Sequence, residues 1–184
     1  MSIFNGKRLP KDTFRIDSKR MRRGWYSDAY FSNTVKILNE LSKENYTFEG
    51  ESDIKDIDCS KVKNADIEVE MQFFTRRKPF SLIAGVDEAL AILKECTGYF
   101  DENGSFVNTY DSLEVEAVHD GTFAFYDGEP LKVQPVLKVR GRYREFAMLE
   151  TPILGVLTET TRIATNVYNT LVATKGKDIL FFPA

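Results

Sequence analysis

Three small groups of polar residues in this chain have the chemistry to hold a substrate. The first is a cationic loop, Arg76-Arg77-Lys78, which follows a segment of alternating apolar residues. An arginine guanidinium binds a carboxylate or phosphate through two parallel hydrogen bonds, and a lysine adds a point charge. A run of charges also fits a turn whose side chains face water. The loop is therefore either an anion-binding loop or a solvated turn.

The other two groups stand where helices are expected to begin. Asp28 and Tyr30 are two residues apart at the start of one such helix. Asp28, with Ser27, also suits an N-cap, and Tyr30 suits a core aromatic position. Glu150 and Thr151 open a later helix, where the helix dipole favours an acid in the first turn. Each pair thus has an ordinary structural role beside a possible binding role.

Other catalytic arrangements find little support in the sequence. No phosphate-binding glycine motif, zinc-protease motif or serine-hydrolase motif is present. His119 is the only histidine and stands beside an expected turn, so a Ser-His-Asp arrangement is not supported. Cys59 and Cys96 lack the spacing of metal ligands, so we expect no metal site. The two cysteines could form a single disulfide, but we expect two reduced thiols.

Length and composition limit the class of protein. The chain has 184 residues, of which 42% are hydrophobic and 12% aromatic, enough for one domain with a sizeable core. The net charge of −3 argues against a nucleic-acid partner, which would require clustered Lys and Arg. Neither an apolar leader nor a membrane-length apolar stretch is present. We therefore expect a soluble cytoplasmic protein without a membrane partner.

The first half of the chain is expected to contain two helices and one strand. Residues 28–44 place apolar side chains on one helical face, and the segment from Val86 to near Gly98 repeats that pattern after a glycine. Residues 67–73 alternate between apolar and polar side chains, as a strand with one wet face does. Residues 49–64 are acidic and weakly patterned, and we expect a loop there.

The second half begins with β structure. Short apolar runs at 114–118, 122–126 and 131–139 are separated by two Asp-Gly pairs, which are typical of hairpins. Pro135 falls inside the last run, so we expect an edge strand or a bulge there. The expected long helix at 145–175 follows.

The last segment bears on domain organisation. Residues 178–184 are apolar without alternation, as buried parallel strands are, and such a strand needs neighbours on both sides. We therefore expect an N-terminal α+β domain at 1–144, and at 145–184 the start of a larger α/β domain whose gene continues past the last residue. Residues 1–24 are expected to form a basic arm that is either solvated or in contact with an anion or a partner subunit.

Several segments, in order, resemble the nicotinate and nicotinamide phosphoribosyltransferases. The resemblance covers roughly residues 24–184. The segments are Ser27–Tyr30, Ile83–Leu90, Asp120–Thr122, Gly128–Pro130, and the most specific stretch, Val139–Tyr143 leading to Leu149–Gly155. That stretch is similar to the family's junction between the N-terminal domain and the barrel, in the shorter archaeal and clostridial type.

The resemblance implies a type II phosphoribosyltransferase, with an open-faced α+β sandwich followed by the first helix and strand of an α/β barrel. Such enzymes form nicotinate mononucleotide and pyrophosphate from nicotinate and phosphoribosyl pyrophosphate in NAD salvage. Mg²⁺ accompanies the phosphoribosyl pyrophosphate, and many members couple ATP hydrolysis. The enzymes are head-to-tail homodimers with shared active sites.

The resemblance also implies roles for individual residues. Tyr30 would stack on the nicotinate ring with Asp28 beside it, in the active site of the partner subunit. The catalytic residues are expected in the barrel, so the 184-residue chain alone is expected to be inactive and to hold no cofactor. The candidate substrate-binding residues are Tyr30, Asp28, Arg76, Arg77, Glu150 and Thr151.

Two alternatives stay open. Quinolinate phosphoribosyltransferase shares the fold, and its substrate carries a second carboxylate that needs more cations, which the Arg76-Arg77-Lys78 loop would supply. The other alternative is a non-catalytic α+β module for dimerisation or ligand binding. Continuation of the gene past Ala184 separates the enzyme from the module, because a free-standing module should not end on an unpaired apolar strand.

Overall fold

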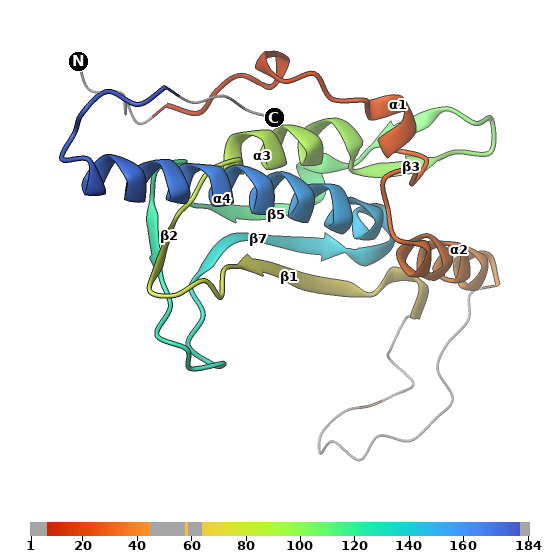
Figure 1. The fold of residues 1–184 in the computed structure, drawn as a ribbon. Coiled ribbons are helices and arrows are strands. Elements are labelled where there is room, and N and C mark those ends of the chain that lie inside the picture. The colour runs from red at the N-terminus through yellow and green to blue at the C-terminus, as the bar shows by residue number, and fades with distance from the viewer. Residues whose placement is uncertain (1–6, 45–57, 59–63, 181–184) are drawn as a thin grey trace.

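The computed structural model describes residues 7–44, 58 and 64–180 and shows an open-faced α+β sandwich (Figure 1). Its main sheet is antiparallel, in the order β1 (Glu68–Phe74), β7 (Pro135–Arg142) and β5 (Glu114–Ala117). Helices α3 (Val86–Cys96) and α4 (Glu150–Ala173) lie over one face of this sheet. The α+β fold class predicted from the sequence is confirmed.

Among the described residues there are also four shorter strands, two further α-helices and several 3₁₀ turns. Strand β2 (Phe80–Leu82) pairs with β6 (Phe123–Phe125), and β3 (Gly98–Phe100) pairs with β4 (Phe106–Asn108). Helices α1 (Ser18–Met21) and α2 (Ala29–Lys43) precede the sheet in the chain. In Figure 1, α2 lies beside the first residues of α4, at the end of the molecule opposite β2.

The core lies between the sheet and the two long helices. Leu137 and Val139 of β7 are fully buried against α3 residues such as Leu93. Helix α3 begins where the Asp120 carboxylate accepts hydrogen bonds from the backbone N–H groups of Val86 (2.8 Å) and Asp87 (3.3 Å). These bonds satisfy two of the donors that a helix leaves unpaired at its N-terminus. The β5–β6 turn therefore fixes the position of α3.

The opposite face of the main sheet carries charged side chains. Arg140 on the central strand forms ion pairs with Glu70 of β1 (2.7 Å) and Glu114 of β5 (3.1 Å). Lys138 forms a third pair, with Glu116 of β5 (3.3 Å). The strand at 67–73 was predicted with one wet face, and β1 confirms it, because its glutamates lie on this charged face while Phe73 is buried.

The predicted β hairpins are wrong, although the Asp-Gly turns exist. The Asp120-Gly121 turn connects β5 to β6, but β5 pairs with β7 and β6 pairs with β2. The hairpin that does form joins β3 to β4 around Asn103-Gly104. A two-residue turn fixes a change of direction, whereas strand partners are chosen by long-range packing. The register between β1 and β7 shifts where Phe73 and Phe74 face Leu137 and Pro135. The bulge predicted at Pro135 is therefore confirmed, whereas the alternative of an edge strand is wrong, because β7 is the central strand.

The basic arm packs along α3 over its described part, while four of its basic side chains, Arg15, Lys19, Arg20 and Arg23, are exposed, as the solvated alternative predicted. Arg8 forms an ion pair with the buried carboxylate of Asp87 (3.0 Å) and donates to the carbonyl oxygen of Ala117 (2.8 Å). Arg22 donates to the carbonyl oxygen of Glu95 (2.9 Å), and Met21 is buried. The arm follows α3 because these arginines find internal carboxylate and carbonyl partners there, which the charge run alone does not reveal.

The C-terminal predictions are partly corrected. Helix α4 begins at Glu150 and not at residue 145, because two short 3₁₀ turns occupy Tyr143–Glu145 and Ala147–Leu149. The predicted strand at 178–184 is not formed over its described part, residues 178–180, where Leu180 is 84% exposed. A strand needs a hydrogen-bonded neighbour, and the described ranges place none beside this segment. Residues 181–184 lie outside the described residues.

Two further predictions concern the cysteines and the acidic loop. Cys96 is a buried free thiol, and burial raises its pKa to about 11. Cys59 and nearly all of the loop predicted at 49–64 lie outside the described residues. Within the ranges that the structure covers, no helix has both the length and the apolar character needed to cross a membrane.

Candidate functional site

The first turns of α2 and α4 are joined by a hydrogen-bonded pair, although the residues are 123 positions apart. The Thr151 hydroxyl donates to the Asp28 carboxylate (3.1 Å) and accepts from the backbone N–H of Asp28 (3.2 Å). Asp28 occupies the N-cap position of α2 as predicted, but its side chain makes no capping bond to the helix. The Asp28 carboxylate instead accepts from Thr151 and so connects α2 to α4.

Tyr30 presents its ring to solvent beside this junction. The side chain is 60% exposed, so the alternative that it is a core aromatic is excluded. The neighbouring Phe31 is buried and lies with its ring centroid 4.2 Å from that of Tyr30. Phe31, Val35 and Leu38 form the buried face of α2. Packing of that face holds the helix in place and leaves the Tyr30 ring available for contact with a ligand.

We call Asp28, Tyr30, Glu150 and Thr151 the α2–α4 site. Partial burial and the nearby Asp28 carboxylate raise the pKa of Glu150 above its ordinary value. The pKa of Tyr30 is also raised, by local desolvation first and then by the charges of Asp28 and Glu150. The four residues were predicted as two separate pairs, and the structure brings them into one electrostatic cluster with negative character.

Tyr143 is a fifth member of this cluster that the sequence did not single out. Burial raises its pKa first, followed by the charges of Glu150 and Tyr30. Its ring stands edge-on to that of buried Phe146, with centroids 6.0 Å apart. Tyr143 belongs to the most family-specific stretch of the sequence, which was the available indication of its importance.

The raised pKa of Glu150 predicts a pH-dependent effect of Glu150→Gln. A carboxyl group whose pKa is higher in the folded than in the unfolded protein opposes folding once it ionises. The penalty is absent well below the ordinary pKa, grows between the ordinary and the raised folded pKa, and is fully present above the folded value. Glu150→Gln is therefore expected to increase the free energy of unfolding at about pH 7 and to change it less at about pH 3, as measured by urea denaturation.

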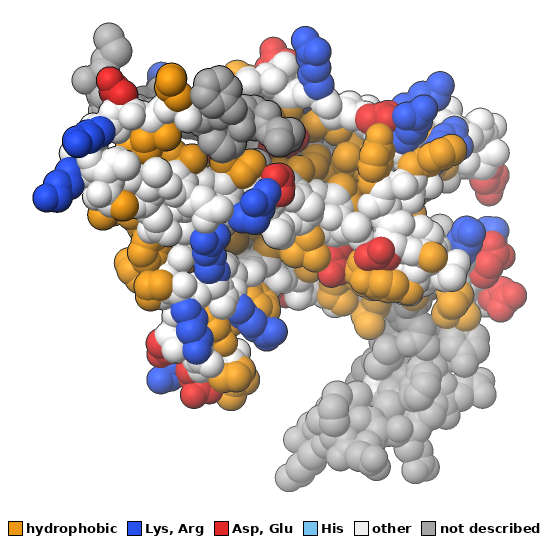
Figure 2. All heavy atoms as spheres, viewed as in Figure 1, with side chains coloured by type: hydrophobic (Ala, Val, Ile, Leu, Met, Phe, Trp, Pro, Cys, Tyr) orange, Lys and Arg blue, Asp and Glu red, His pale blue; other side chains and the backbone are white. Residues whose placement is uncertain are grey.

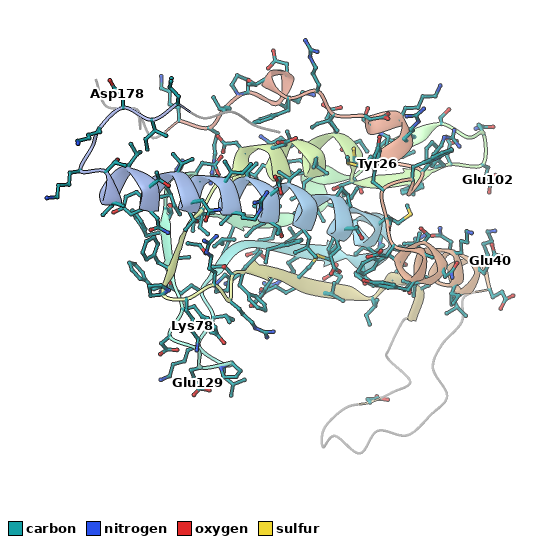
Figure 3. All side chains as sticks on the ribbon, viewed as in Figure 1. Tyr26, Glu40, Lys78, Glu102, Glu129 and Asp178 are labelled. Atoms are coloured by element: carbon teal, nitrogen blue, oxygen red, sulfur yellow. The ribbon has the colours of Figure 1, made fainter. Side chains whose placement is uncertain are left out.

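Glu129→Gln is the matched control for this experiment, because Glu129 is exposed and lies at the opposite end of the molecule (Figure 3). It should show no comparable difference between the two pH values. A loss of stability at neutral pH in Glu150→Gln would contradict the electrostatic description of the site.

The other predicted binding residues, Arg76 and Arg77, lie in the loop between β1 and β2, away from the α2–α4 site. The Arg77 guanidinium donates to the side-chain carbonyl of Asn166 on α4 (2.7 Å). Glu150 and Asn166 are sixteen residues apart on one helix, which corresponds to roughly 24 Å. In Figure 3, Lys78, which follows Arg77 in the chain, lies far from Glu40 of α2. Within one chain these arginines cannot contact a pyridine ring held at Tyr30.

His119 and the acidic side chains of the described residues form no further candidate catalytic or metal site. His119 is exposed in the β5–β6 turn, as predicted, and its carbonyl oxygen accepts from the Thr122 hydroxyl (2.7 Å). Over residues 7–44, 58 and 64–180, no three His, Cys, Asp or Glu side chains gather as a set of metal ligands.

Comparison with known proteins identifies the family to which this fold belongs. A family profile described as the N-terminal domain of quinolinate phosphoribosyl transferase matches residues 56–161, more than half of the chain. No curated protein sequence matches the chain at a significant level.

Solved structures show the same fold. The chain is similar to nicotinate-nucleotide pyrophosphorylase from Pyrococcus furiosus, with a TM-score of 0.56, 22% identity and coverage of 88% of this chain and 32% of that one. It is also similar to human nicotinic acid phosphoribosyltransferase, with a TM-score of 0.54, 17% identity and coverage of 86% and 31%. The chain thus spans about a third of each of these proteins. Together with the profile match, this fold shows that the chain belongs to the family of quinolinate phosphoribosyltransferase N-terminal domains, within the type II phosphoribosyltransferases.

Proposed function

We propose that this chain is the N-terminal part of a nicotinate phosphoribosyltransferase, and that its α2–α4 site contacts the nicotinate ring. The observation that carries the proposal is the exposed Tyr30 ring, held by the buried Phe31 and flanked by the Asp28 and Glu150 carboxylates. The fold shared with a nicotinic acid phosphoribosyltransferase supports it.

The charge of the site suits the chemistry of this reaction. The pyridine nitrogen forms a bond to the ribose C1 of phosphoribosyl pyrophosphate, the bond from C1 to the pyrophosphate oxygen breaks, and pyrophosphate leaves. Positive charge develops on the ribosyl carbon and remains on the pyridinium product. An aromatic face attracts a cation, and carboxylates at fixed positions stabilise charge as it develops. Tyr30 would contribute the aromatic face, and Asp28 and Glu150 the negative charge.

The remaining parts of the proposal concern the whole enzyme. We propose that it acts in NAD salvage in the cytoplasm as a homodimer, with this site completing the active site of the partner subunit. Mg²⁺ would accompany phosphoribosyl pyrophosphate, and ATP hydrolysis would be coupled to the reaction. The described residues offer two carboxylates at the α2–α4 site and no larger acidic cluster, so the groups that hold Mg²⁺ and phosphate are proposed to lie in the barrel.

Tyr30→Ala is expected to weaken nicotinate binding by the complete gene product about three- to tenfold, as the loss of one aromatic contact does. Tyr30→Phe keeps the ring and should bind nicotinate nearly as well as the unchanged protein. Because Tyr30 is mostly exposed, the free energy of unfolding should change by less than about 0.5 kcal/mol. Calorimetric titration with nicotinate and urea unfolding measure the two quantities.

Tyr26→Ala is the control for this pair, since Tyr26 is also an exposed tyrosine, 45% exposed, and its hydroxyl is bonded to Asp17 (3.0 Å). It should leave nicotinate affinity unchanged. A fall in melting temperature for Tyr30→Ala without any change in affinity would rule out the ring contact.

Quinolinate phosphoribosyltransferase is the second candidate, and the description of the matched family favours it. Quinolinate carries one carboxylate more than nicotinate and therefore needs an additional cation close to its ring. The charged side chains at the α2–α4 site are carboxylates, and the charge of Asp28 raises the pKa of Glu150 there. The complete gene product should be assayed for pyrophosphate release with nicotinate, nicotinamide and quinolinate. Release with quinolinate alone would replace our proposal, and release with none of them would favour a non-catalytic module.

A further inference from the structure

A second candidate site lies beneath α4, at the end of β1 remote from the α2–α4 site. It is a cavity of about 340 Å³, which is within the range of small-molecule pockets. Buried Phe73, Ile83 and Leu157 contribute apolar walls. The Arg76, Arg77 and Arg162 side chains also line it. Figure 2 shows Lys and Arg side chains descending from α4 toward the lobe that carries Lys78, with hydrophobic side chains beside them.

The three arginines are poorly neutralised. Arg76 stacks over the Phe74 ring (5.2 Å to its centroid), and Arg77 donates to the neutral amide of Asn166. Neither has an ion pair within the described part of the chain. Arg162 pairs with Glu159 three residues earlier on α4 (2.8 Å), and both side chains are more than half exposed, so the pair contributes little. The cavity therefore has a net positive rim.

Three of the four hydroxyl groups in the same lining, those of Thr75, Ser81 and Thr161, are already engaged. The hydroxyls of Thr75 and Ser81 are bonded to each other (3.0 Å), and the Thr161 hydroxyl donates to the carbonyl oxygen of Ala84 (3.1 Å). A free phosphate would find guanidinium groups here but would leave the apolar walls in contact with water. A planar ring with one carboxylate satisfies both features, because the ring covers the walls while a guanidinium binds the carboxylate.

We propose that this arginine-rimmed cavity is a binding site for a small aromatic monocarboxylate, separate from the α2–α4 site. Glu150 and Arg162 are twelve residues apart on α4, so the arginine rim lies roughly 18 Å along the helix from Glu150, whereas the near wall of the cavity begins at Leu154, about one turn from Glu150. Within one chain, a small ligand whose carboxylate is bound at the arginine rim does not reach the Tyr30 ring. The proposal does not depend on the reaction that the α2–α4 site serves.

Benzoate is the probe that tests the proposal, because it carries the ring and the carboxylate without a pyridine nitrogen. It should bind the purified protein in a calorimetric titration. Arg77→Gln and Arg162→Gln should each weaken benzoate binding about tenfold, the effect expected for losing one charge-assisted hydrogen bond. Thr158→Trp, at an exposed lining position on α4, should block the cavity and abolish binding.

Two control variants establish that the measured binding belongs to this cavity. Arg23→Gln removes another exposed arginine that stacks on an aromatic ring, Phe100 (4.7 Å), and should leave benzoate affinity unchanged. Tyr30→Ala should also leave it unchanged, whatever that variant does to nicotinate. Thermal unfolding of each variant establishes that it is folded before its affinity is compared.

The outcomes that overturn the proposal are distinct from those that would overturn the proposed reaction. Absence of benzoate binding, or binding that survives both Arg77→Gln and Thr158→Trp, removes the cavity as a site. If inorganic phosphate competes with benzoate and binds with equal affinity, the apolar walls do not contribute to binding the ring, and the proposal is wrong on that point. Loss of benzoate binding in Tyr30→Ala would place the probe at the α2–α4 site and refute a second site.

Discussion

Gly85→Ala is expected to lower the free energy of unfolding by about 2–5 kcal/mol, from backbone strain and overpacking together. Gly85 precedes α3 with φ +91°, a conformation that L-residues with side chains rarely adopt. An added Cβ would also overlap the Thr160 hydroxyl on α4. That hydroxyl is shared between the carbonyl oxygens of Ala84 (2.7 Å) and Val156 (2.6 Å), so it cannot move away without losing a partner.

Gly104→Ala separates the two contributions to this effect. Gly104 also has a positive φ, +77°, but no atom lies within 4 Å of the position of its added Cβ. Gly104→Ala should lower the free energy of unfolding by only about 1–2 kcal/mol, which is the contribution of backbone strain alone. Urea unfolding followed by circular dichroism measures both variants. Equal losses would show that the contact between α3 and α4 at Gly85 has been misjudged.

Phe146→Ala is expected to cost about 3–5 kcal/mol of unfolding free energy, as the truncation of a buried phenylalanine does. Phe146 is 2% exposed and packs in the main core cluster with Leu149 and Ile153. Its ring also supports the edge of Tyr143 beside the α2–α4 site. The cavity left behind should therefore loosen the site as well as the core, and nicotinate affinity should fall with stability.

Phe125→Ala is the control for the core effect, because Phe125 is 59% exposed on β6 and should lose less than about 1 kcal/mol. Phe146→Leu fills part of the cavity, so its loss of unfolding free energy should lie between those of Phe146→Ala and Phe125→Ala. A Phe146→Ala protein as stable as Phe125→Ala would contradict the assignment of this ring to the core.

Local periodicity accounts for the parts of the fold that could be predicted from the sequence. The helix expected at 28–44 is α2, and the strand expected at 67–73 is β1, shifted by one residue. Each has a repeat long enough to distinguish a helix from a strand. The predicted strand partners were wrong because β7 pairs with strands about 65 and 25 positions before it, and no local pattern records such distances.

The candidate site was predicted in part for a similar reason. Asp28 and Thr151 were each expected at a helix start, but their contact depends on how α2 packs against α4. Arg76 and Arg77 were grouped with them on charge alone, and the extended length of β1 carries that loop to the opposite end of the sheet. Tyr143 was missed because its importance comes from neighbours that are distant in the sequence.

The charged face of the main sheet has a consequence for encounters between molecules. Both outer strands, β1 and β5, carry glutamates there, and the basic side chains stand on the central strand. If two copies paired through the edge strands β1 or β5, glutamates of one copy would lie opposite glutamates of the other. Like charges on directly opposite residues destabilise a pair of strands. We expect this arrangement of charge to oppose edge-to-edge association of the sheet.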